Sequence, residues 1–303
     1  MASSAARLAQ AVGVVALLAS SPARAEPSPP LPHDYPHAPE AFDDGRGDDA
    51  LLPPIFLQLG CRNRSREFWG IAQIGLLDTR SVDFNGVLQL SLDHNANRTT
   101  IGAAQVALAN YSYEFYGLMQ VGAHNIIGRE IYAVAQIGGF NDANGVFLGL
   151  LQLGVANRWR FHRRNWAIAP LQVGIYNERA APSYTLGQVG IVNFLGEGTI
   201  HAPWRIGVFN GGDDTVAALL QAGVVNWMPE GRGFFGLEVG LLNRSREFHG
   251  PAQIGLVNYS EAVHGAQIGV YNHAGVLRGI QIGLLNRSED GGLPWSPVMN
   301  LGW

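Results

Sequence analysis

The sequence predicts an all-β fold built from tandem one-strand repeats, and three observations lead to that prediction. A short unit, Gln–aliphatic–Gly–aliphatic–any–Asn, recurs about fifteen times, most clearly from Gln267 to Asn272 and from Gln281 to Asn286. Apolar residues alternate with period two inside each unit, as in a strand with two different faces. Gly, Asn, Asp, Ser and Pro separate the units, which indicates turns. A short fixed period determines the architecture before any single residue can be given a chemical role.

The Gln position sets the register of the repeat. Successive copies lie 14 to 17 residues apart, with one step of 20 between Gln152 and Gln172. The residue after Gln is aliphatic in every copy, so we expect that face of each strand to contact something apolar. The exceptions to Gly are Ser91 and Ala107, and the exceptions to Asn are Asp78 and His94.

The N-terminal residues predict export. Residues 1–25 combine an early charge, an apolar run from Leu8 to Ala19 and an Ala23-Arg24-Ala25 motif, which together indicate a signal peptide. That run is too short to span a bilayer as a helix. Residues 26–54 are rich in Pro and acidic residues, which predicts a disordered linker. The β repeat domain is then expected to span residues 55–303.

Composition narrows the class of protein. The formal net charge is −4, with no basic or acidic excess, so no nucleic-acid partner is expected. The single Cys61 excludes a disulfide within the chain. Few cysteines behind an export signal suit a bacterial envelope protein better than a disulfide-stapled secreted domain.

The first architecture we expect is a transmembrane antiparallel β-barrel of about 16 strands. Each unit would supply one strand of about ten residues and a short turn, with the aliphatic face toward lipid. The aromatic residues five positions before Gln would form a girdle at the membrane interface; they include Phe68, Phe84, Phe115, Phe147 and Phe248. The residues expected to line the lumen are Gln73, Gln136, Gln188, Arg205, Glu238, Gln253, Gln267 and Gln281.

The end of the chain favours the barrel in one respect and opposes it in another. Alternating residues from Trp295 to Trp303 resemble the last strand of bacterial outer-membrane barrels, whose final aromatic residue is recognised during assembly. This resemblance implies outer-membrane lipid and the barrel-assembly machinery as partners, with Trp303 as the assembly signal. Asn300, however, has the opposite parity to the other Asn residues, so a barrel needs a register slip or a bulge in its last copy.

The alternative architecture is a β-solenoid in which each unit forms one coil. Its aliphatic face would line a dry interior, and Asn would stack on Asn in a hydrogen-bonded ladder. The discriminating observation is whether neighbouring units pair antiparallel or stack parallel.

Residues 55–303 also resemble a family. The tandem units at Gln253, Gln267 and Gln281 are similar to the surface repeats of bacterial envelope proteins, whose chains end on an aromatic strand. The similarity is strongest from Leu237 onward; it implies a surface or outer-membrane location and no known activity. A narrower segment, from Gln267 to Ala274, is similar to the core of curlin repeats and supports the solenoid.

The sequence offers little for catalysis. It has no Gly-x-Ser-x-Gly, phosphate-loop or His-Glu-x-x-His motif, so no enzymatic activity, metal or cofactor is expected. Ser91 and Asp93 would share one face of a strand while His94 points away, so these three cannot form a triad. One basic segment departs from the repeat and could bind anionic lipid; its arginines are Arg158, Arg160, Arg163 and Arg164.

Two functions therefore remain open at this level. The first is a non-enzymatic outer-membrane protein, either a passive pore or a structural barrel. The second is a secreted or surface-attached β-solenoid with an adhesive or structural role. Both place the protein outside the cytoplasm.

Overall fold

The computed structural model describes residues 57–160, 167–180, 183–196, 198–212 and 214–303. The chain divides into two units, Met1–Asp48 and Asp49–Trp303, and every described residue belongs to the second. The expected signal peptide and linker lie outside the described residues, as does most of the basic segment. Among the described residues, no helix is long and apolar enough to cross a bilayer.

The described part of the chain is built from strands. β5 and β13 are continuous extended segments that bend at corners, and each holds two copies of the repeat. The strands are β1 (Leu57–Trp69), β2 (Ala72–Asn85), β3 (Leu88–Ser91), β4 (His94–Val106), β5 (Ala109–Ala143), β6 (Val146–Arg160), β7 (Ala167–Ala180), β8 (Ser183–Leu195), β9 (Ile200–Gly212), β10 (Val216–Ala222), β11 (Val225–Val239), β12 (Leu242–Ile254), β13 (Val257–Asp290) and β14 (Ser296–Gly302).

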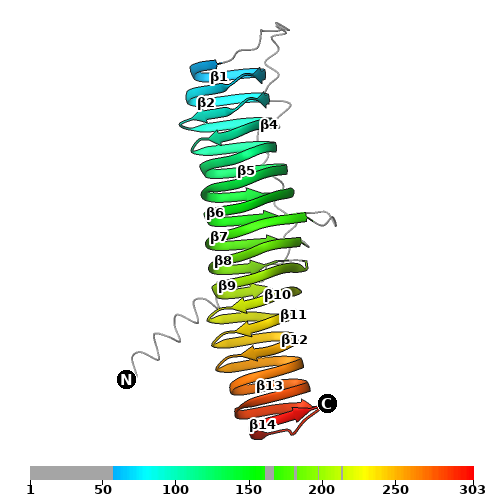
Figure 1. The fold of residues 1–303 in the computed structure, drawn as a ribbon. Helices are drawn as coiled ribbons and strands as arrows, with labels where there is room; N and C mark the ends of the chain where they lie inside the picture. The colour runs from blue at the N-terminus through cyan, green and yellow to red at the C-terminus, as the bar shows by residue number, and fades with distance from the viewer. Residues whose placement is uncertain (1–56, 161–166, 181–182, 197, 213) are drawn as a thin grey trace, which may run out of the picture. The chain divides into compact units, whose positions relative to one another are not determined.

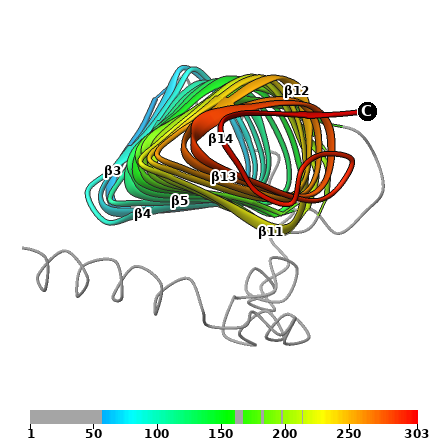
Figure 2. The same cartoon turned by 90° about the horizontal axis from the view of Figure 1, so that it is seen from below.

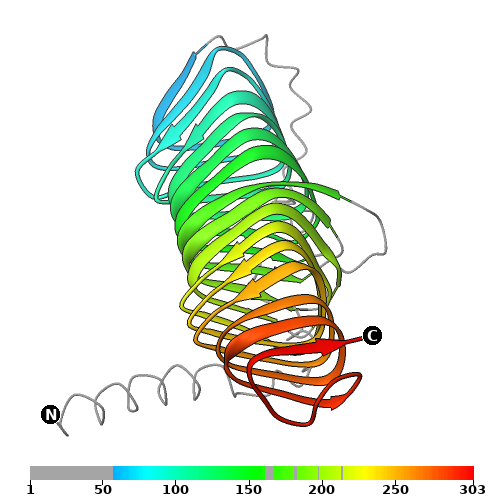
Figure 3. The same ribbon diagram turned by 60° about the horizontal axis from the view of Figure 1, so that its bottom comes forward.

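The strands stack as a β-solenoid, so the prediction of a closed antiparallel barrel is wrong. Strand order follows the sequence from β1 to β14, and these two end strands do not pair with each other. Neighbouring strands pair parallel up to β13, for example β7 with β8 and β11 with β12. Figures 1 and 3 show the coils following one another along the stack, and Figure 2 shows their roughly triangular outline. A parallel neighbour arises because each copy completes one full turn and returns in the same direction.

Pairing is in register, so equivalent positions of successive copies lie next to one another. Gln152 pairs with Gln172, and Gln172 with Gln188. We call these stacked side chains the Gln row and the corresponding asparagines the Asn row. The sequence alone places Asp78 and His94 at the Asn position. Because the register shifts after Gly60, Thr79 and Asn95 occupy the Asn row in these two copies instead.

The solenoid has its amides inside and its aliphatic face outside. The Gln row is fully buried from Gln73 to Gln281. The residues that follow Gln are half-buried or exposed instead; Leu153 is 41% and Ile282 is 42% exposed. The expectation that the aliphatic face lines a dry interior is therefore wrong. The amides can be buried because stacked side chains supply one another's hydrogen-bond partners. The alternation of the sequence does not show which of the two faces is buried.

Apolar side chains fill the remaining interior. Phe115 and Phe147 are fully buried in one apolar cluster, and Phe248 is fully buried in a second cluster. Phe68 stacks on Phe84 with 5.1 Å between ring centroids. The expected aromatic girdle is therefore wrong: these phenylalanines form the core of the solenoid.

The last strand caps the stack. β14 pairs antiparallel with β13 and places Asn300 opposite Gln281. The side-chain amide of Asn300 donates to Oε1 of Gln281 at 3.2 Å. Asn300 thus ends the Gln row rather than the Asn row, which accounts for its opposite parity.

Candidate functional surface

The Gln row is a continuous chain of side-chain hydrogen bonds. Nε2 of Gln172 donates to Oε1 of Gln152 at 2.9 Å, and Gln188 donates to Gln172 at the same distance. In this pattern each later copy donates to the earlier one. Buried amides need such partners, because an unpaired polar group in the interior costs about 1–3 kcal/mol.

The Asn row runs in the opposite sense. Nδ2 of Asn141 donates to Oδ1 of Asn157 at 2.8 Å, so the earlier copy donates to the later one. The same Nδ2 also donates to the carbonyl oxygen of Leu153 at 3.0 Å, which engages both of its hydrogens. The two rows therefore carry opposed amide dipoles, and both tie each copy to its neighbour.

Glycine between the two rows makes room for the asparagines. A Cβ on Gly154 would lie 2.6 Å from the carbonyl oxygen of Gly138 and 2.7 Å from Nδ2 of Asn141. Both distances are shorter than real Cβ contacts allow, and the first involves backbone that cannot swing aside. At Gly154 the glycine of the repeat is therefore a steric requirement of the Asn row, whereas Ser91 and Ala107 are accommodated at this position in two earlier copies.

The direction of hydrogen-bond donation in the Gln row is reversed at one residue, Gln221, which lies between Arg205 and Glu238. Arg205 has only donors, and it donates to Oε1 of both Gln188 and Gln221, at 3.2 and 3.4 Å. Glu238 has only acceptors, and it accepts from Gln221 at 3.3 Å and from Gln253 at 2.8 Å. Gln221 lies between them and is turned over, so that it accepts from the earlier copy and donates to the later one.

Burial perturbs both charges. Desolvation lowers the pKa of Arg205 to about 9, although Glu238 opposes that shift. Desolvation raises the pKa of Glu238 to about 7, against hydrogen bonds from Gln253 and Gln221 and the charge of Arg205. A third buried charge, Arg179, lies over the Trp159 ring at 4.9 Å, and its pKa falls to about 9 mainly through burial. The interior thus holds charges at an energetic cost.

The outer side of the Gln row forms what we call the aliphatic face. It consists of three positions in each copy: the residue before Gln, the residue after Gln and the third residue after Gln. None of these positions carries a charged residue in any of the fifteen copies. Its most exposed members are Leu57, Leu59, Leu76, Leu92, Leu108, Met119, Leu153, Val155, Ile175, Ile191, Trp204, Ile206, Val208, Val224, Leu241, Leu256, Ile268, Val270, Ile282 and Leu284.

A shallow groove runs along the middle of this face. Its volume is about 720 Å³, and it extends from Ile137 to Val208 across five copies. Glycines such as Gly154 and Gly190 form its floor, because they point inward and add no side chain to the surface. Aliphatic side chains form both walls. The groove is open along its length and contains no titratable group.

Charged residues gather on the side of the coil that follows the Asn row. Ion pairs join neighbouring copies there, as between Arg129 and Glu114 at 3.0 Å and between Arg232 and Glu247 at 3.2 Å. These pairs are partly exposed, so each contributes at most about 1 kcal/mol. Their main consequence is a sharp contrast with the uncharged aliphatic face.

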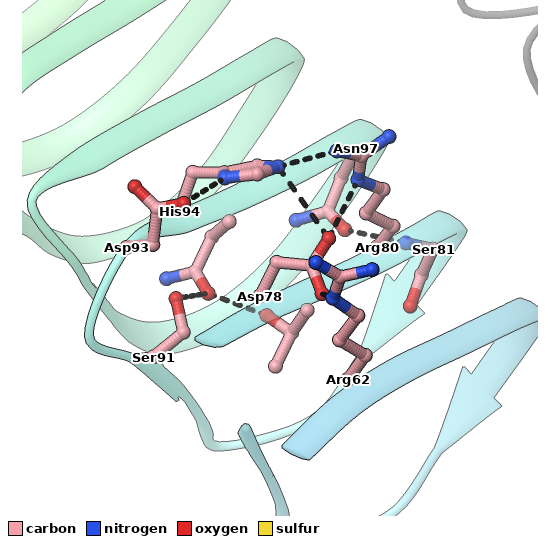
Figure 4. Close-up of polar contacts among 10 residues, drawn as sticks. Arg62, Asp78, Arg80, Ser81, Ser91, Asp93, His94 and Asn97 are labelled. Atoms are coloured by element: carbon pink, nitrogen blue, oxygen red, sulfur yellow. Dashed lines mark hydrogen bonds and ion pairs between the residues drawn. The ribbon is translucent and has the colours of Figure 1, made fainter. Parts of the chain in front are cut away.

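A polar cluster surrounds Asp78 on β2 (Figure 4). Arg80 approaches Asp78 at 3.1 Å and Arg62 approaches it at 3.8 Å. Arg80 also lies 2.7 Å from Nε2 of His94, whose Nδ1 faces Asp93 at 3.2 Å. The carboxylate of Asp78 already occupies the position that an anionic ligand would take between the two arginines.

This cluster contains no catalytic triad. Ser91 donates to Oδ1 of Asn95 at 2.9 Å and makes no hydrogen bond to His94. Within the described ranges, no group of three His, Cys, Asp or Glu side chains could hold a metal ion. The cluster joins the first copies to one another at the point where the repeat is least regular.

The residues expected to line a lumen have none to line, since the fold is not a barrel; from Gln73 to Gln281 they are fully buried in the Gln row. Trp303 is 94% exposed. Arg158 is paired with Glu178 at 3.3 Å. The side chain of Arg160, together with Arg163 and Arg164, lies outside the described residues, so binding of anionic lipid there stays a prediction.

Comparison of the chain with protein-family models, with curated proteins and with solved structures finds no match in any of the three. The resemblance to bacterial surface repeats therefore stays an expectation drawn from the residues. A functional assignment has to rest on the surfaces of the solenoid itself.

Proposed function

We propose that this protein is a non-enzymatic structural module, exported to the cell surface or beyond, that attaches to an apolar partner through its aliphatic face. One observation carries the proposal: an uncharged aliphatic surface continues in register through all fifteen copies, with side chains such as Leu284 exposed by 74%. At a strand spacing of about 4.8 Å and a rise of about 3.3 Å per residue, the face measures roughly 70 Å by 13 Å, or about 900 Å². The largest apolar patch on a typical monomer covers about 300–600 Å².

The interior supports a structural role. Every copy is tied to the next by backbone pairing, by the Gln row and by the Asn row, as between Gln152 and Gln172 and between Asn157 and Asn177. Stability in such arrays comes from repeated contacts between neighbouring copies. The result is a rigid support that keeps the aliphatic rows straight and evenly spaced. The sequence of residues 1–25 supports export.

Charge placed on the aliphatic face is expected to abolish attachment. Ile175 and Ile191 occupy the same position in adjacent copies and are 52% and 50% exposed. In the Ile175→Lys, Ile191→Lys variant, we expect adsorption of the purified full chain to an octyl-coated surface to fall at least tenfold, because two ammonium groups would have to lose water on contact. Adsorption is measured by surface plasmon resonance.

A matched control distinguishes adsorption through this face from adsorption through any exposed apolar residue. Val134 and Leu150 are also neighbours in adjacent copies and are 47% and 59% exposed, but they lie two positions before Gln, around a corner of the coil. The Val134→Lys, Leu150→Lys variant should adsorb like the unmodified protein. Equal adsorption by the two double variants would show that the aliphatic face is not the attachment surface.

A further inference from the structure

We propose that the apolar partner of the aliphatic face is a second copy of the same chain, bound face to face. This inference rests on the proposed function, since it names the occupant of the same surface. It is carried by three properties of the face: its lack of charge, its area and its corrugated shape.

The lack of charge limits what can bind. Three positions in fifteen copies contain no Asp, Glu, Lys or Arg, so the face offers no counter-charge to an acidic or a basic partner. Residues 26–54 of this chain are a poor occupant because acids such as Asp43 and Asp44 recur along them. An identical uncharged face, in contrast, brings no unpaired charge into the contact.

The composition of the face also distinguishes a second copy from a lipid surface. Membrane-binding surfaces use Lys and Arg near the headgroups and Trp or Tyr at the interface. The only aromatic residue at the three positions is Trp204, and no cation accompanies it there. The face therefore lacks the anchors that a bilayer would engage.

The area matches what a stable dimer needs. Two faces of about 900 Å² would bury about 1,800 Å² in total, within the range of roughly 1,200–2,000 Å² for specific stable interfaces. The face of each chain would become buried along its length. The side of the coil that precedes this face also lacks Asp, Glu, Lys and Arg two and four positions before Gln, but polar groups such as those of Asn85, Tyr184 and His249 interrupt it.

The shape of the face is complementary to itself. Residues such as Val173 and Ile175 belong to straight ridges that run along the stack, with the shallow groove between them. Ridges of one chain can enter the groove of the partner chain when their two sheets pack about 10 Å apart, as in dry interfaces between stacked strands. Equal spacing of ridges in both partners follows from the shared repeat.

Sedimentation equilibrium of the full chain tests the inference. We expect a mass twice that of the 32.6 kDa chain at micromolar concentration. The Ile175→Lys, Ile191→Lys variant should sediment as a monomer, with the dissociation constant raised at least a hundredfold, because each dimer would bury four lysines. The Val134→Lys, Leu150→Lys control should remain a dimer. Circular dichroism confirms that the variants are folded, and Val224→Lys with Leu241→Lys replaces the first pair if that pair does not fold.

Other outcomes separate this inference from the proposed function. A monomeric protein that floats with phosphatidylcholine vesicles would assign the face to lipid and overturn the dimer. A monomeric protein that still adsorbs to the octyl surface, with loss on Ile175→Lys and Ile191→Lys, would overturn the dimer and leave attachment through the face in place. A dimer that persists in both lysine variants of the face would place the contact elsewhere and overturn the inference.

Discussion

Replacing Gly154 with valine is expected to lower the free energy of unfolding by about 4 kcal/mol. The new Cβ would meet the carbonyl oxygen of Gly138 at 2.6 Å and Nδ2 of Asn141 at 2.7 Å. Overpacking of this kind costs about 1–3 kcal/mol, and a displaced asparagine leaves a buried polar group unpaired at a further cost of about 1–3 kcal/mol. Denaturant unfolding followed by circular dichroism measures the loss.

The control is a glycine-to-valine substitution at a different position of the preceding copy, Gly139, which follows Gly138, the equivalent of Gly154. Gly139 points outward in a row where Val155 and Ile175 stand in the next two copies, and a Cβ there would meet only the carbonyl oxygen of Ala123, at 3.0 Å, among close contacts. Gly139→Val should change stability by less than about 1 kcal/mol. A similar loss for both variants would mean that the Asn row does not impose the glycine.

The second large effect is expected from the reversal in the Gln row. In Arg205→Gln, Gln221 would lie between the side-chain oxygen of the new glutamine and the carboxylate of Glu238. Both are acceptors, and the amide of Gln221 can donate toward only one of them. Glu238→Gln creates the opposite conflict, in which donors face donors. Each single variant should lose about 3 kcal/mol, because buried charges and amides without partners cost about that much.

The double variant is expected to lose about 3 kcal/mol as well, rather than the sum of about 6 kcal/mol, because it removes the conflict but also the bonds from Arg205 to the carbonyl oxygens of Asn193 and Gly211. With glutamine at both positions, Gln221 can turn over and join a row of uniform direction from Gln58 to Gln281. The double variant also removes two charges whose pKa values are shifted by burial, those of Arg205 and Glu238. A double-mutant cycle from denaturant unfolding should give a coupling energy of about 3 kcal/mol. Additive losses would contradict the hydrogen-bond pattern of this segment.

Much of the fold could be predicted from the repeat, but not which face is buried. Alternation correctly groups Ile280, Ile282 and Leu284 on one face and Gln281 and Gly283 on the other, but it wrongly places Leu285, which is 44% exposed, with the buried Gln281. It does not choose between them, because an aliphatic face can contact lipid, a core or another protein. The choice depends on hydrogen bonds between residues about sixteen positions apart, which form only when copies stack in register.

One sequence signal could have found the corner. Gln267 and Asn272 are five positions apart, so a straight strand would place them on opposite faces. Both are fully buried, because the chain turns after Val270 and two successive residues face outward. A five-residue spacing between two recurring amides therefore indicates a bend between them.

The reversal in the Gln row was visible only in part. Arg205 and Glu238 stand out in the sequence as departures from Gln. Their relation required the structure, since it depends on Gln221 being turned over between them. Likewise the one-residue shift that brings Thr79 and Asn95 into the Asn row follows from pairing with the first strand.

Distances between spin labels test most directly whether the fifteen copies stack parallel with the aliphatic face outside. Leu76, in the second copy, is labelled together with Ile175 or with Leu284, in a Cys61→Ser background diluted with unlabelled chain. At about 4.8 Å per copy, the two distances should be about 29 Å and about 62 Å. A second distance equal to or shorter than the first would mean that the sheet closes on itself, and would contradict the solenoid.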